Sequence, residues 1–264
     1  MSAGRPRAGR GPGPAGVAAF SLLLSAASID TASAYRPFDG TDAHVAGPHL
    51  LEIEAGPLGY LRTGSERFLV VPETVVNFGT GSGFELALEG RGLLVMSPDP
   101  ERSLPRIDDA SFVAKKVLRP GVLQERPGPS IATEEALLLP QSGEHRVGGS
   151  ASLIVSQQWE DLGSHLNAAV LRSREQEFAG FASIIADGPE RWPVRPAAEL
   201  SIGFQRNEPP VRGLVAGLIW QTRQGLTLDA AVRIATGLEH ELELRSGFTW
   251  KMQLPPPKRG GHIR

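Results

Sequence analysis

The chain has 264 residues and no Cys, so disulfide bonds and thiolate metal sites are excluded. A formal net charge of −2 is too balanced to indicate a nucleic-acid-binding protein, and outside the N-terminus no apolar run approaches the length of a membrane helix. The 31 Gly and 22 Pro residues favour a fold with many turns, and a transmembrane barrel remains possible because alternation dilutes its hydrophobicity.

The first residues have the pattern of an export signal. Arg5, Arg7 and Arg10 precede a run of apolar and small residues over 15–29, and the small residues Ala32–Ala34 match a cleavage site. We therefore predict a signal peptide over 1–34, cleaved after Ala34. An uncleaved anchor helix is disfavoured because the run is short and rich in Ala and Ser.

Residues 35–48 are polar and turn-rich, and we expect them to form an N-terminal segment outside any sheet, at a barrel mouth. From there on the chain alternates between apolar and polar residues with period two, which is typical of β-strands. The predicted strands cover about 49–56, 67–78, 83–94, 109–118, 130–139, 148–158, 163–172, 176–186, 195–205, 212–222, 226–236 and 241–251. Residues 253–264 are Pro-rich and basic, and we expect a disordered tail there.

The last strand has the clearest pattern. Leu242, Leu244, Phe248 and Trp250 would lie on one face, and charged residues such as Arg245 on the other. Two earlier stretches are less regular. Pro72 within 67–78 predicts a bulge, because proline cannot donate a hydrogen bond to a neighbouring strand, and 130–139 has no clean face.

About twelve strands of about ten residues each predict an all-β fold, an antiparallel up-and-down transmembrane β-barrel over 49–252. An even strand number places both ends of the barrel chain on the same side. The short turns predicted at 80–83, 159–163 and 223–225 fall on that side, and the longest predicted loop, 97–107, falls on the opposite side.

Several segments resemble a known family. The segments 35–42, 127–134, 165–168 and 192–196 are similar to a family of proteobacterial outer-membrane proteins regarded as transporters of the phenol meta-pathway type, and the similarity spans most of 35–252. The resemblance implies a β-barrel in the outer membrane with a transport role. It carries no catalytic residues over to this chain.

In such a barrel the polar faces of the strands line the lumen. The candidate lumen-lining residues are Glu52, Glu54, Glu73, Glu85, Glu89, Arg91, His165, Asn167, Arg195, Glu199, Asp229, Arg233, Glu241, Glu243 and Arg245. Two interpretations remain open: a narrow polar channel whose acid and Arg lining sets selectivity, and a lumen packed by ion pairs with no conducting path.

No pattern in the sequence favours covalent chemistry. Outer-membrane phospholipases pair a His with a Ser two residues later, whereas Asn167 follows His165 at that spacing and Ser164 would point to the other face. Glu239, His240 and Glu241 diverge along a strand, which is unfavourable for a metal site. We therefore predict no enzyme, no cofactor and no metal.

The sequence thus predicts an outer-membrane channel or transporter for small solutes, aromatic or hydrophobic ones included, with outer-membrane lipid as its surroundings and no nucleic-acid partner. The alternatives are a structural barrel with a closed polar lumen and a soluble periplasmic ligand-binding barrel, which would have an apolar interior. The oligomeric state and the identity of the solute stay open.

Overall fold

The structure is a computed structural model that describes residues 36–96, 105–141, 145–222 and 225–256. The strands are β1 (Leu50–Gly56), β2 (Gly59–Thr63), β3 (Glu66–Gly81), β4 (Phe84–Val95), β5 (Pro105–Arg119), β6 (Ser130–Leu138), β7 (Gly148–Gln158), β8 (Gly163–Arg172), β9 (Phe178–Asp187), β10 (Val194–Gln205), β11 (Val211–Gln221), β12 (Leu226–Thr236) and β13 (His240–Gln253). A short 3-10 helix, η2 (Val122–Gln124), lies between β5 and β6. None of the helices in the described ranges is both long and apolar enough to span a membrane.

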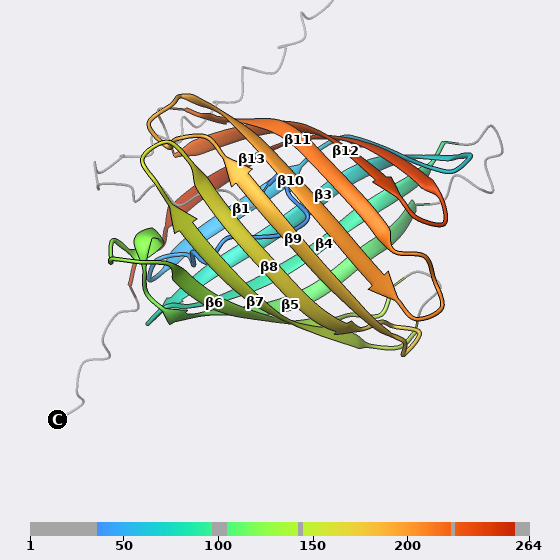
Figure 1. The fold of residues 1–264 in the computed structure, drawn as a ribbon, viewed down its shortest axis with the longest axis horizontal. Helices are drawn as coiled ribbons and strands as arrows, with labels where there is room; N and C mark the ends of the chain where they lie inside the picture. Colours follow the sequence, from blue (N-terminus) through green and yellow to red (C-terminus); the bar gives the residue numbers. More distant parts are fainter. Residues whose placement is uncertain (1–35, 97–104, 142–144, 223–224, 257–264) are drawn as a thin grey trace, which may run out of the picture. The chain divides into compact units, whose positions relative to one another are not determined.

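The strands form one closed antiparallel barrel (Figure 1). Each strand from β3 to β12 pairs with the next strand in sequence, and both β1 and β2 pair with β3 on one side and β13 on the other. β1 and β2 therefore lie end to end in a single strand position, which gives twelve positions around the wall. The predicted up-and-down barrel of about twelve strands is confirmed.

The sequence missed β2, because Gly56, Pro57 and Gly59 predicted the end of a strand. Pro57 has no backbone N–H and interrupts the pairing for two residues. The chain then resumes in the same register against β3, with Gly56 opposite Glu73 and Gly59 opposite Val70. The interruption is local and does not reverse the chain.

Other strand ends shift by a few residues. β5 begins at Pro105, so residues 105–107 belong to a strand and not to the predicted loop 97–107. The rest of that loop, 97–104, lies outside the described residues. β13 continues to Gln253, one residue past the predicted barrel end. The bulge predicted at Pro72 is confirmed by a register shift between Val70 and Glu73. The predicted signal peptide and residues 257–264 of the predicted tail lie outside the described residues.

Period-two alternation sorts the side chains into an apolar outer face and a polar inner face. On β10, Leu200 is 59% exposed and its neighbour Glu199 is 1% exposed. On β13, Leu244 is 46% exposed and Glu243 is 2% exposed. The apolar side chains that project outward from the wall in this way include Leu88, Leu153, Leu166, Leu214, Leu218, Val232 and Ile234. A soluble barrel would have the reverse distribution, with its apolar residues inside.

The two ends of the barrel differ in what they carry. We call the end where β1 begins and β13 finishes the terminal end; the connections 82–83, 120–129, 159–162, 188–193 and 222–225 lie there. The opposite end, which we call the loop end, carries the connections 64–65, 96–104, 139–147, 173–177, 206–210 and 237–239.

Candidate functional site

The lumen contains part of the protein's own chain. Residues 36–47, which we call the N-terminal segment, run inside the barrel and contact the inner faces of β3, β4, β5, β7, β8, β10, β12 and β13 (Figure 1). The expectation that residues 35–48 pack at a barrel mouth is therefore wrong for the described part. The segment binds within the lumen because the wall offers charged and polar partners at successive heights.

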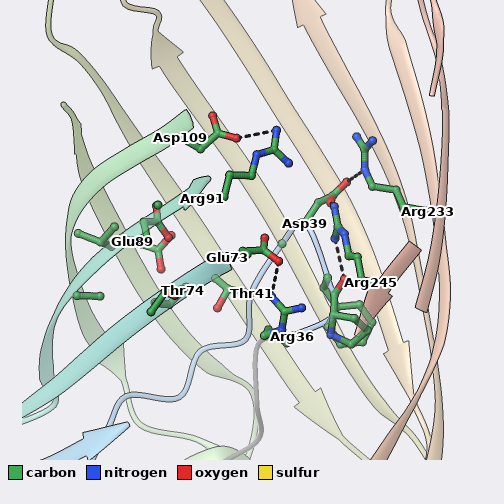
Figure 2. A pocket seen from close by; sticks show the side chains of 18 of the residues that line it. Arg36, Asp39, Thr41, Glu73, Thr74, Glu89, Arg91, Asp109, Arg233 and Arg245 are labelled. Atoms are coloured by element: carbon green, nitrogen blue, oxygen red, sulfur yellow. Dashed lines mark hydrogen bonds and ion pairs between the residues drawn. The ribbon is translucent and has the colours of Figure 1, made fainter. Parts of the chain in front are cut away.

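Arg36 lies between acidic side chains of two strands. Its guanidinium forms an ion pair with Glu73 on β3 (Figure 2). It also lies 3.5 Å from the carboxylate of Asp229 on β12. Between them the wall carries Gly56 and Gly247, where an added Cβ would lie 2.7 Å and 2.5 Å from guanidinium nitrogens. Burial lowers the pKa of Arg36, but Glu73 and Asp229 outweigh burial and the pKa is raised, so the side chain stays charged.

Asp39 is held by two arginines. One carboxylate oxygen accepts a hydrogen bond from Nε of Arg233 at 2.7 Å, and the other accepts one from Nη2 of Arg245 at 2.7 Å (Figure 2). Burial alone would raise the pKa of Asp39, but the two guanidinium groups outweigh it and lower the pKa from its ordinary value. Asp39 therefore remains an anion inside the lumen.

The backbone of the segment is satisfied by side chains of the wall. The N–H groups of Asp39 and Gly40 donate to the carboxylate of Glu199 at 2.6 and 2.8 Å. Thr41 donates its N–H to Asn167 and accepts from the Asn167 amide at 2.9 Å. A Cβ at residue 40 would lie 2.6 Å from Ser183 Oγ, so only glycine fits there without displacement. These contacts require one specific path of the backbone, so the segment is bound to the wall and does not merely fill the lumen.

The side chains of Ser156, His165 and Asp187 form a hydrogen-bonded row beneath the segment, near the terminal end. Ser156 Oγ is 2.8 Å from Nδ1 of His165, whose Nε2 is 3.3 Å from Asp187, and Arg195 donates to Asp187 at 2.6 Å. The hydroxyl of Ser156 is fully buried and accepts the N–H of Ala43 at 2.8 Å. No open space adjoins this hydroxyl, so the row positions the segment and offers no accessible nucleophile.

A cavity of about 570 Å³ adjoins residues 36–41 of the segment and extends to Asp109 and Glu241 near the loop end (Figure 2). Nine of the candidate lumen residues line it: Glu73, Glu85, Glu89, Arg91, Asn167, Arg233, Glu241, Glu243 and Arg245. The other six, Glu52, Glu54, His165, Arg195, Glu199 and Asp229, are buried within the barrel but do not line this cavity. The structure thus brings nine of the fifteen together around one space.

The lining of the cavity is rich in carboxylates. Arg91 lies 2.8 Å from Asp108 and 3.1 Å from Asp109, and Arg245 contacts Glu243 at 2.8 Å. Against four arginines, the lining carries eight carboxylates: Asp39, Glu73, Glu85, Glu89, Asp109, Glu134, Glu241 and Glu243. The cavity is therefore acidic.

The sequence interpretation missed several lining residues. Arg36 and Asp39 precede every strand, so strand alternation could not assign them to the lumen. Glu134 was missed because 130–139 has no clean face: the inner residues of β6 include the small Ala132 as well as Glu134. The register of β6 against β5, with Glu134 opposite the buried Lys115, is the signal that places it inside.

Within the described ranges, no group of three or more His, Asp or Glu side chains has an arrangement that could hold a metal ion. Glu239 and His240 lie at the turn into β13, and Glu241 instead accepts a hydrogen bond from Arg233 at 2.6 Å.

Comparison with solved structures shows the fold. The COG4313 outer membrane channel from Pseudomonas putida F1 is similar with a TM-score of 0.59 and 9% identity, over 81% of this chain and 100% of that chain. Weaker likenesses are the KdgM porin (TM-score 0.48, 11% identity, 75% of this chain and 98% of that chain) and the CymD monoaromatic hydrocarbon channel (0.45, 7%, 80% and 90%). No protein-family model matches the sequence, and no curated protein matches it.

Proposed function

We propose that this protein is an outer-membrane channel for small hydrophilic solutes, constricted by its own N-terminal segment. The observation that carries the proposal is the inverted barrel: apolar side chains outside, and an acidic cavity inside. An outer face of exposed Leu, Val and Ile favours contact with lipid, and a closed sheet leaves no unpaired edge in the hydrocarbon. Export by a signal peptide cleaved after Ala34 is part of the proposal.

The lining of the cavity favours cations over anions. Rings of acidic side chains in a pore concentrate cations, and eight carboxylates face four arginines here. The same lining disfavours apolar solutes, because their entry would remove water from charged groups. Aromatic and hydrophobic solutes, and the phenol meta-pathway type, therefore remain a prediction that a solute panel would test.

Neighbouring glutamates on β6 give a matched test of ion preference. Glu134 lines the cavity, whereas Glu135 projects from the outer face of the same strand and is exposed. In planar bilayers under a salt gradient, we expect Glu134→Gln to move the reversal potential toward lower cation preference and Glu135→Gln to leave it unchanged. Equal reversal potentials for the wild type and Glu134→Gln would remove Glu134 from the ion path.

The second candidate function is a structural barrel whose lumen is closed. The ion pairs that hold Arg36 and Asp39 favour it, because they fill part of the lumen with chain. Membrane fractionation and heat-modifiable gel migration test whether the barrel inserts at all, and bilayer recordings separate the two functions. An inserted barrel that passes no current at any voltage would support the closed lumen and contradict the channel.

A further inference from the structure

Two arginines lie directly opposite each other on the outer face at the loop end. Arg62 on β2 is the cross-strand partner of Arg67 on β3, and both side chains are exposed. Their neighbours Leu61 and Phe68 are buried in the lumen, so alternation directs both arginines outward. The pair follows from the tight connection at 64–65, which fixes the register of the two strands.

This arrangement is unfavourable without an anion. Like charges on directly opposed strand residues destabilise a sheet. Among the described residues, the guanidinium groups of Arg62 and Arg67 have no hydrogen-bond or ion-pair partner. Glu66, which precedes Arg67, alternates to the other face of β3 and does not lie between the two guanidinium groups.

The surroundings of the pair are those of a lipid-facing wall. Leu242 on β13 is the other cross-strand neighbour of Arg62, and Tyr60 and Leu69 form the next outward pair along β2 and β3. The arginines thus lie where the apolar outer face reaches the loop end. At that height in a membrane, the groups within reach of a side chain are lipid headgroups, and the anion they offer is phosphate.

Resting on the proposed membrane barrel, we propose that Arg62 and Arg67 together bind the phosphate of an anionic lipid, whose headgroup carries no compensating cation, in the leaflet at the loop end. Guanidinium groups present planar forks of N–H donors that match phosphate oxygens, and two forks on adjacent strands can bind different oxygens of one phosphate. The phosphate neutralises the repulsion between the arginines, and the lipid tails lie along Tyr60, Leu69 and Leu242.

The test measures lipid retention by native mass spectrometry of the folded protein in a nonionic detergent, with dioleoyl phosphatidic acid as the probe. Loss of two charge-assisted contacts predicts at least about tenfold weaker binding for a double variant, Arg62→Gln with Arg67→Gln. Arg172→Gln is the control, because Arg172 is also exposed at the loop-end terminus of β8 but lies between Gly149 and Phe178, with no arginine opposite. We expect it to bind the lipid as the wild type does.

Three results would overturn the inference: undiminished binding by the double variant, equal retention of phosphatidylcholine, or displacement of the lipid by inorganic phosphate at equal concentration, which would indicate a free-phosphate site. Heat-modifiable migration and insertion into phosphatidylcholine vesicles are measured on the same preparations. Insertion without selectivity for phosphatidic acid contradicts the lipid site alone, and failure to insert contradicts the proposed function.

Discussion

Asp39 shows how a single residue ties the N-terminal segment to the wall. Its carboxylate faces Arg233 on β12 and Arg245 on β13, and Glu199 on β10 lies against its backbone N–H. The pKa of Asp39 is lowered, so the carboxylate stabilises the bound segment at any pH above the ordinary carboxyl pKa of about 4. That contribution is lost as the pH falls through the lowered pKa of the bound state.

The sign of this shift gives a prediction for conductance. We expect protonation of Asp39, and with it the loosening of the segment, to raise the wild-type conductance only in strong acid, below the ordinary carboxyl pKa. Asp39→Asn should conduct more at every pH and lose most of the acid-dependent rise. Bilayer recordings over a pH series check this, and an identical acid-dependent rise in the Asn variant would show that another group titrates.

At the scale of the strand, a substitution on β11 (Val211–Gln221) tests which face of the barrel wall is in contact with lipid. Leu218 projects outward and is 53% exposed, whereas Ile219 next to it is fully buried. A cation on the lipid face of a barrel costs about 2 to 4 kcal/mol near the bilayer midplane. We therefore expect Leu218→Arg to lower the free energy of unfolding by up to about 4 kcal/mol, according to its depth in the bilayer, in urea titrations of vesicle-inserted protein.

The control for this prediction is Leu218→Met, which keeps an apolar side chain and should change the free energy of unfolding by less than about 1.5 kcal/mol. If Leu218→Arg unfolded at the same urea concentration as the wild type, the outer face of β11 would be in contact with water and the membrane interpretation would fail at this strand.

The same alternation explains why the strands could be predicted from sequence. A wall with an apolar outer face and a polar inner face imposes unlike neighbours along every strand, so β12 and β13 are recognisable from local sequence alone. The prediction fails where that contrast is weak or short. β6 was predicted as a strand, but its inner face was not assigned because the small Ala132 lies on it, and β2 was missed because it is a strand of five residues that follows a proline.

At the scale of the molecule, the sequence could not predict the contents of the lumen. Asp39 binds Arg233 and Arg245, which are about 200 positions away in sequence, and such contacts leave no periodic signal. Alternation assigns the arginines to the inner face, but it cannot show that part of their charge is neutralised by the protein's own N-terminal segment. The expectation of a segment at the mouth therefore failed where the strand assignments succeeded.

Removing the segment tests whether the wall and its contents are separable. Every strand pairs with two neighbours of the wall, and β1 closes the ring between β3 and β13 without help from residues 36–47. A chain lacking 36–47 should therefore fold and remain heat-modifiable. Its conductance should rise, because Glu199, Arg233 and Arg245 would then face water in a wider lumen.

A point substitution gives the same test without shortening the chain. A Cβ at Gly79 on β3 would lie 1.9 Å from the carbonyl oxygen of Gly47 and 2.3 Å from that of Ala46, so Gly79→Val should expel this end of the segment. At Gly203 an added Cβ has ordinary contacts only, the nearest at 3.9 Å, and Gly203→Ala should conduct as the wild type does. If neither the deletion nor Gly79→Val raised the single-channel conductance of a folded, inserted barrel, the N-terminal segment would not be the constriction, and the limit on flow would have to lie in the ion pairs of the wall itself.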